Sequence, residues 1–131
     1  MMKLVAAIAA LTFLTLPAYG AVVCKRIGDD PFKQEETLFI SGDTGAYSYN
    51  AYDGSRTYLT DIECGITAKS GAVCMRVFQR EDGLTVEHYS IDKLLGVAAL
   101  NHTSFTQNSN LLGTRHYASK DSFLVDCSGE P

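Results

Sequence analysis

Residues 56–80, RTYLTDIECGITAKSGAVCMRVFQR, are the most informative segment of this 131-residue chain. Two runs rich in β-branched and aromatic residues lie on either side of the turn-forming centre 68–71. The first run contains Cys64 and the second contains Cys74. This pattern predicts a β-hairpin with one cysteine in each arm.

The spacing of these two cysteines is compatible with a disulfide across the hairpin. With the turn centred on Lys69, Cys64 and Cys74 lie directly opposite each other, and opposite residues of an antiparallel pair have Cα atoms about 4.5–5.5 Å apart. The Cys74 face of the second arm also carries Arg76 and Arg80, whereas Val73, Met75 and Val77 form its more apolar face. We therefore expect a β-bulge to reconcile the two arms.

The first 20 residues have the features of a secretory signal peptide. They begin Met-Met-Lys, continue with an apolar run over 4–16, and end with small residues at the positions that precede a cut after Gly20. The run is shorter than the roughly 20 apolar residues of a membrane-spanning helix, and no later segment reaches that length. We therefore predict a signal peptide over residues 1–20 and a single β domain over residues 21–131. The domain is expected to be periplasmic or secreted, without membrane insertion.

The length and charge of the processed chain narrow its possible partners. Removing residues 1–20 leaves 111 residues, which is the length of one domain with a modest core. It also removes Lys3, so ten basic side chains remain against 15 acidic ones and the formal charge is −5. The chain has no run of Lys or Arg, and we expect no nucleic-acid partner.

All four cysteines lie in the part of the chain that is expected to be exported. An even number of cysteines in such a domain indicates two disulfides, and four cysteines allow three pairings. We favour Cys64 with Cys74, because they face each other across the hairpin, and Cys24 with Cys127, because this bond would join the two ends of the domain. The two other pairings stay open.

Short runs with strand character recur along the chain between turn signals. We expect strands at residues 22–27, 37–40, 46–52, the two arms of the cysteine hairpin, 84–91, 97–106 and 114–127. Segment 92–100 could also form a short helix, but Gly96 would cost that helix about 1 kcal/mol, so we prefer a turn followed by a strand. Residues 107–110, QNSN, are expected to form a loop.

Seven or eight short strands predict an all-β domain, built as a small antiparallel meander barrel or as a sandwich, with two disulfides. A bond between Cys24 and Cys127 would make the first and last strands neighbours. This would favour a closed barrel, which leaves no exposed sheet edge.

Three histidines, His88, His102 and His116, fall on three consecutive predicted strands at a spacing of 14 residues. With turns centred near residues 94 and 110, their side chains would share one face of the sheet, which is a conceivable zinc or copper site. The odd-numbered residues of these strands, such as Val97 and Phe105, are more apolar, so we expect the histidines on the outer face. We therefore keep them as weak metal candidates only and predict no metal and no cofactor.

Four tyrosines, Tyr47, Tyr49, Tyr52 and Tyr58, lie on two adjacent predicted strands around the turn 53–55. Tyr47 and Tyr49 share one face, and Tyr52 is on the other. Exposed tyrosines combine a large contact area with a polar hydroxyl and are frequent in contacts with proteins and glycans. We expect some of these four residues to bind a partner, although tyrosines in strands are more often part of a core.

No segment has the pattern of a catalytic site. No serine lies in a Gly-x-Ser-x-Gly turn, the cysteines are better explained as disulfides, and the paired carboxylates lie in turns. We therefore predict a non-enzymatic exported module that binds, or acts like an inhibitor of, an unknown protein or glycan partner. The alternative is a periplasmic metal-binding or small hydrolytic protein that uses the histidine face.

Overall fold

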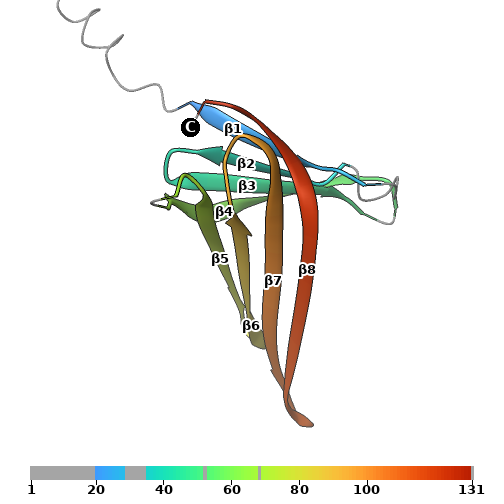
Figure 1. Cartoon of the computed structure of the whole chain (residues 1–131). Coiled ribbons are helices and arrows are strands. Elements are labelled where there is room, and N and C mark those ends of the chain that lie inside the picture. The colour runs from blue at the N-terminus through green and yellow to red at the C-terminus, as the bar shows by residue number, and fades with distance from the viewer. Residues whose placement is uncertain (1–19, 29–34, 52, 68, 131) are drawn as a thin grey trace, which may run out of the picture.

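The chain forms an antiparallel β-barrel of eight strands in sequential order (Figure 1). The computed structural model describes residues 20–28, 35–51, 53–67 and 69–130. The strands are β1 (Ala21–Arg26), β2 (Thr37–Ser41), β3 (Thr44–Asn50), β4 (Arg56–Ile66), β5 (Ala72–Arg80), β6 (Gly83–Ile91), β7 (Gly96–Asn110) and β8 (Gly113–Gly129). The all-β prediction is confirmed, and the architecture is the barrel rather than the sandwich.

Both expected disulfides close the barrel. Cys24 of β1 lies directly opposite Cys127 of β8 and is bonded to it, with 4.0 Å between the Cα atoms. Cys64 of β4 is bonded in the same way to Cys74 of β5, with 4.1 Å between the Cα atoms. Each bond therefore spans one of the two places where strands β1–β4 meet strands β5–β8.

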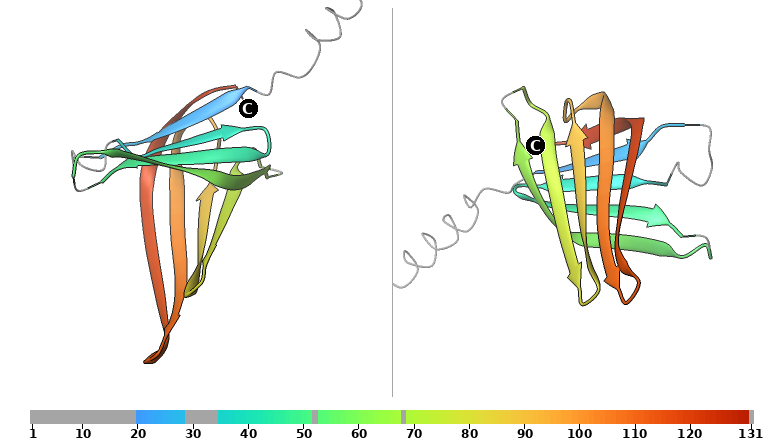
Figure 2. Two further views of the ribbon diagram at one scale, coloured as in Figure 1. Left: turned by 180° about the vertical axis from the view of Figure 1, so that it is seen from behind. Right: turned by 90° about the horizontal axis from the view of Figure 1, so that it is seen from below.

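Strands β1–β4 and β5–β8 are joined only over short stretches. The β4–β5 ladder covers Glu63–Ile66 with Ala72–Met75, and the β1–β8 ladder covers Val22–Arg26 with Val125–Gly129. Beyond these ladders the two groups cross at a wide angle, and the hairpins β5–β6 and β7–β8 extend past the rest of the barrel (Figures 1 and 2). We call residues 76–87 and 104–119 the projecting sheet, and the rest of the barrel the closed part.

The closed part contains the hydrophobic core, because alternate residues of every strand point inward there. The largest fully buried apolar side chains come from five different strands and are Val22, Leu38, Tyr89, Leu100 and Val125. Leu94, in the β6–β7 connection, is only 4% exposed and donates its backbone N–H to the carbonyl of Ser70 at 3.0 Å. This contact ties the β6–β7 connection to the β4–β5 turn at the closed end of the barrel.

The turn positions reverse one prediction about side-chain faces. Residues 92–95 form the expected turn, but β7 continues through the predicted loop at 107–110 and turns only at Leu111–Leu112. In the resulting register Tyr89 pairs with His102, which pairs with Asp121. The inner face therefore carries odd-numbered residues on β6 and β8 but even-numbered residues on β7. The inward orientation expected for Val97 and Phe105 is wrong, and their side chains are 51% and 41% exposed.

The expected bulge lies in a different hairpin. The β4–β5 register around the disulfide is regular, whereas the β3–β4 register shifts between Gly45 and Tyr47. At Gly45 a Cβ atom would lie 2.7 Å from the Cys64 Sγ atom, so only glycine fits there. Arg76 therefore keeps its side chain on the inner face. There it lies opposite Glu87 of β6, which provides an unlike charge.

Candidate functional site

A cluster of charged side chains lies inside the barrel where the closed part meets the projecting sheet. Arg26 donates to the carboxylates of Glu36 at 2.8 Å and of Asp121 at 3.0 Å. Its guanidinium group also lies 4.0 Å from the centre of the Phe123 ring. The Arg26 side chain is only 13% exposed, so a single cation joins the loop before β2 to β1 and β8. We call Arg26, Glu36 and Asp121 the inner charge cluster.

Three rings stack beside the inner charge cluster. The His102 imidazole is nearly parallel to the Tyr89 ring, with 4.3 Å between the ring centres. The Tyr47 ring packs against both, at 5.0 Å from Tyr89 and 5.7 Å from His102. Burial lowers the pKa of His102, and the nearby carboxylates of Glu87 and Glu36 oppose this shift without overcoming it. The imidazole is therefore neutral at pH 7.

The two buried tyrosine hydroxyls are poorly suited to acid–base chemistry. Burial, followed by neighbouring carboxylates, raises the pKa of both Tyr47 and Tyr89. The Tyr89 hydroxyl donates to the Glu87 carboxylate at 2.8 Å. Two buried polar atoms in the described region have no hydrogen-bond partner, Nε2 of His102 and Nε of Arg76. An internal polar group such as water could satisfy them.

The three histidines do not converge. His102 points into the barrel, whereas His88 lies opposite Thr103 and His116 lies opposite Gln107 on the outer face. Among the described residues, no group of three or more histidine, cysteine, aspartate or glutamate side chains could hold a metal ion. The expectation that all three histidines share the outer face is therefore wrong, and the metal-binding or hydrolytic alternative loses the arrangement on which it was based.

The four candidate tyrosines also separate. Tyr47 is 4% exposed and belongs to the core, and Tyr49 packs beside it on the same face with 6.2 Å between ring centres. Tyr58 is 62% exposed and faces outward. Tyr52 lies outside the described residues. Of the described candidates, Tyr58 is therefore the one whose ring is freely available to a partner.

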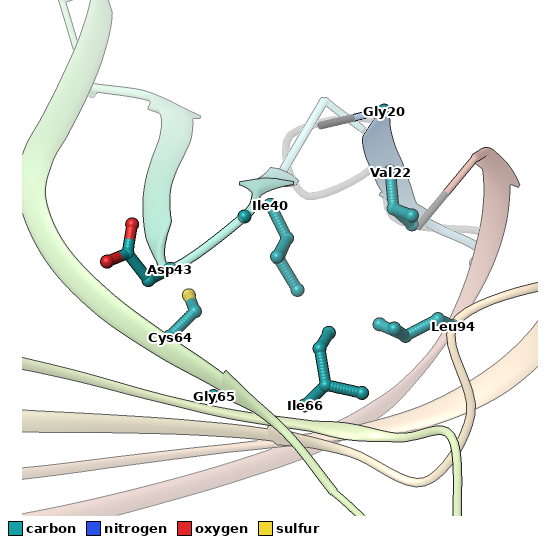
Figure 3. Close-up of a pocket in the computed structure, with 9 residues that line it drawn as sticks. Gly20, Val22, Ile40, Asp43, Cys64, Gly65, Ile66 and Leu94 are labelled. Atoms are coloured by element: carbon teal, nitrogen blue, oxygen red, sulfur yellow. The ribbon is translucent and has the colours of Figure 1, made fainter. Parts of the chain in front are cut away.

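A hollow with a volume of about 580 Å³ lies at the closed end of the barrel. In Figure 3 the side chains of Val22, Ile40, Ile66 and Leu94 point toward one another around it, while the Asp43 carboxylate points away. The lining is therefore apolar and suits an aliphatic group. Val22, Ile40 and Leu94 are already at least 96% buried, so a guest would remove little further surface from water.

The outer face of the projecting sheet exposes several apolar side chains. Val77, Val86, Phe105 and Ala118 lie directly opposite one another on successive strands and form one row across the sheet. We call these four residues the outer apolar row. The side chains of Val77 and Phe105 are 53% and 41% exposed, and Met75, two residues before Val77, is 40% exposed.

The sequence patterns missed the outer apolar row because they assigned Phe105 to the core. The alternation in β5 did indicate it, since Val73, Met75 and Val77 lie on the face opposite Cys74. A disulfide cysteine marks the inner face, so these three side chains had to point outward. This reasoning places Val77, the β5 member of the row, on the outer face.

Comparisons of the chain with protein-family models, curated proteins and solved structures found no match. Within the described ranges, no helix has the length and apolar character needed to cross a bilayer. Function must therefore be argued from the surfaces and clusters of the barrel itself.

Proposed function

We propose that the chain is an exported, non-enzymatic module that binds a protein partner through the outer apolar row. Export to the periplasm or the cell exterior is supported by the leader-like residues 1–20 and by the two disulfides, which persist in oxidising compartments.

The observation that carries this proposal is the exposure of the row. Solvated sheet faces normally carry polar side chains, and a contiguous exposed apolar patch commonly marks an interaction site. Fully burying a valine or phenylalanine contributes about 1.5–3 kcal/mol. Val77 and Phe105 still expose about half of their side-chain surface, so contact with a partner would recover a substantial part of this energy.

The chemistry of the surface favours a protein partner over a glycan. Sugars are usually held by flat aromatic rings together with polar groups, whereas this row is mainly aliphatic. A depression of about 550 Å³ borders the row and includes Val86, Phe105 and Ala118 in its lining. It could receive one apolar side chain of a partner. The polar residues Thr103 and Lys120, which also line it, would contact the rim of the interface.

The test compares two exposed positions on the same strand and the same face. The processed chain is used to capture partners from a periplasmic extract, and binding of the captured protein is then measured for the variants Phe105→Ser and Val97→Ser. We expect Phe105→Ser to weaken binding at least tenfold, or about 1.4 kcal/mol, and Val97→Ser to leave it unchanged. Equal affinities in these two variants, with unchanged thermal melts, would show that the row is not the binding surface.

A further inference from the structure

The outward-facing edge of β8 in the projecting sheet has no strand beside it in the described structure. The β1–β8 ladder ends at Arg26 and Val125, followed by one bond from the Ile27 N–H to the Leu124 carbonyl. From Thr114 to Lys120, the strand pairs only with β7. This edge is long and regular, and such edges readily accept another strand.

The hydrogen bond from the Ile27 N–H to the Leu124 carbonyl indicates which backbone groups of β8 face the free edge. Because the Leu124 carbonyl points away from β7, and backbone groups alternate along a strand, the even-numbered residues of β8 point their N–H and C=O groups toward the free edge. The β7–β8 register is continuous from Gly113 to Cys127 of β8, so this alternation holds along the whole edge. Ala118 lies at the centre, and its backbone groups face outward.

We propose that a second copy of this chain binds here, with the two β8 edges joined antiparallel about a two-fold axis at Ala118. The projecting sheets of the two copies would then form one continuous sheet of eight strands. Hydrogen-bonded pairs would form between Ala118 and its counterpart, and between His116 and Lys120 of the second copy. This inference concerns the edge and does not depend on the outer apolar row binding a foreign protein.

The charged side chains of β8 favour the register with the axis at Ala118 over its neighbours. Registers with the axis at residues 116, 117, 119 or 120 place no unlike charges opposite each other, and an axis at Lys120 would oppose two lysines. With the axis at Ala118, Arg115 lies opposite Asp121 of the second copy, and symmetry repeats this pair. The Asp121 side chain is 46% exposed, so its carboxylate is accessible to a second cation beside Arg26.

The apolar side chains support the same register. The outer apolar row reaches the edge of the sheet at Ala118, so an axis there continues the row without a break into the row of the second copy. Leu112 of the second copy, in the turn before β8, would approach Leu124 and Ile27 where the pairing of β1 with β8 ends. Among the large apolar side chains of the described residues, Leu111 and Leu112 are the most exposed, at 106% and 87%, and Leu124 and Ile27 are also about half exposed. The dimer therefore gives four exposed aliphatic side chains an apolar neighbour.

The oligomeric state and its dependence on the edge provide the first test. We expect sedimentation of the processed chain to show a concentration-dependent dimer. Ala118→Pro should make the protein monomeric at concentrations at which the parent is dimeric, because proline removes an edge N–H without removing a bond to β7. Ala118→Ser, which keeps that N–H, should remain a dimer. A monomeric parent, or an Ala118→Pro protein that is folded and dimeric, would overturn the proposal.

Cysteine crosslinking tests the register. Ala118→Cys places two thiols on the axis, where opposite Cα atoms are about 5.5 Å apart, and should give a covalent dimer on mild oxidation. Thr114→Cys faces Ser122 of the second copy and should crosslink at least tenfold more slowly. If both variants crosslink equally, the proposed axis is wrong.

Arg115 separates this dimer from binding through the outer apolar row, because its side chain lies on the opposite face of the sheet. Arg115→Ala should weaken the dimer about two- to thirtyfold, because it removes both symmetry-related cross-strand ion pairs, whereas Arg80→Ala on the far edge should have no effect. Partner capture by Arg115→Ala should be unchanged. Loss of partner capture in Phe105→Ser with an intact dimer would conversely affect only the proposed function.

Discussion

The closed part and the projecting sheet continue the same strands but distribute apolar side chains differently. In the closed part the inner face is apolar, and both disulfides lie there. In the projecting sheet the inner face mixes charged residues such as Arg76 and Glu87 with the exposed rings of Phe78 and Tyr117, and the outer face carries the outer apolar row. Regular alternation therefore builds a core where a second layer exists and an exposed apolar surface where it does not.

The largest expected effect is the loss of the bond that closes the barrel. Replacing both Cys24 and Cys127 by serine should reduce the free energy of unfolding by about 4.7 kcal/mol, because this bond closes a loop of about 100 residues in the unfolded chain. Replacing both Cys64 and Cys74 should cost about 2.8 kcal/mol, because that loop has only about 11 residues. Denaturant unfolding measures both values. Equal losses would indicate that loop length does not determine how much each disulfide stabilises the folded protein.

A second pair of substitutions compares the two regions on one strand. Leu100 is 1% exposed in the closed part, so Leu100→Ala should destabilise the protein by about 3 kcal/mol. Phe105→Ala removes a larger side chain from the projecting sheet but should cost less than about 1 kcal/mol, because the ring is already 41% exposed. Thermal and denaturant unfolding are the measurements. A larger loss at Phe105 would mean that the projecting sheet has a core of its own.

The inner charge cluster at the boundary should have an intermediate effect. Arg26→Met leaves the Glu36 carboxylate, which is 18% exposed, without its 2.8 Å partner, and we expect a loss of about 2 kcal/mol. Arg80→Met, in the projecting sheet, serves as the control and should cost less than about 0.5 kcal/mol. Unfolding at pH 7 compares the two variants. If Arg26→Met is no less stable than Arg80→Met, the inner charge cluster does not stabilise the barrel.

The smallest expected effect is a pH dependence that depends on His102. Because burial lowers the pKa of His102 in the folded protein, the unfolded chain binds its proton more readily. Stability should therefore fall as the pH decreases below about 6.5, the ordinary histidine value. His102→Phe should reduce this dependence between pH 7 and pH 5, whereas His88→Phe on the outer face should not. An unchanged slope in His102→Phe would assign the pH dependence to the carboxylates.

The sequence was sufficient for the parts of the fold that depend on strands and cysteines. The period-two alternation around Cys64 and Cys74 and the position of Cys24 and Cys127 near the ends favoured the observed disulfides and, with them, a closed barrel over a sandwich. Both follow from local patterns and from the distance that a disulfide can span. The closed part was therefore largely predictable.

The projecting sheet was less predictable because its geometry depends on where each turn lies. The polar run 107–110 has loop composition, yet it continues β7, and the turn falls on the two leucines that follow. Displacing a turn by one residue exchanges the two faces of the next strand. For His102 and Phe105 the decisive shift lies in the β6–β7 connection, where Ile91 pairs with Leu100 and Tyr89 with His102. It moved His102 inward and Phe105 outward, and it removed the expected histidine face. Tyr47 was misjudged for a different reason, since tyrosine suits a core and a surface equally well.

The Cys24–Cys127 bond also makes most of the domain a covalent ring. The exposed turn at Leu111–Leu112 lies inside that ring and outside the small loop closed by Cys64 and Cys74. If a protease cuts the chain at this turn, the Cys24–Cys127 bond still holds the two fragments together. They separate only after this disulfide is reduced. In an oxidising environment such a nicked molecule would keep its eight strands tethered, so cleavage at this exposed turn would not by itself release a strand.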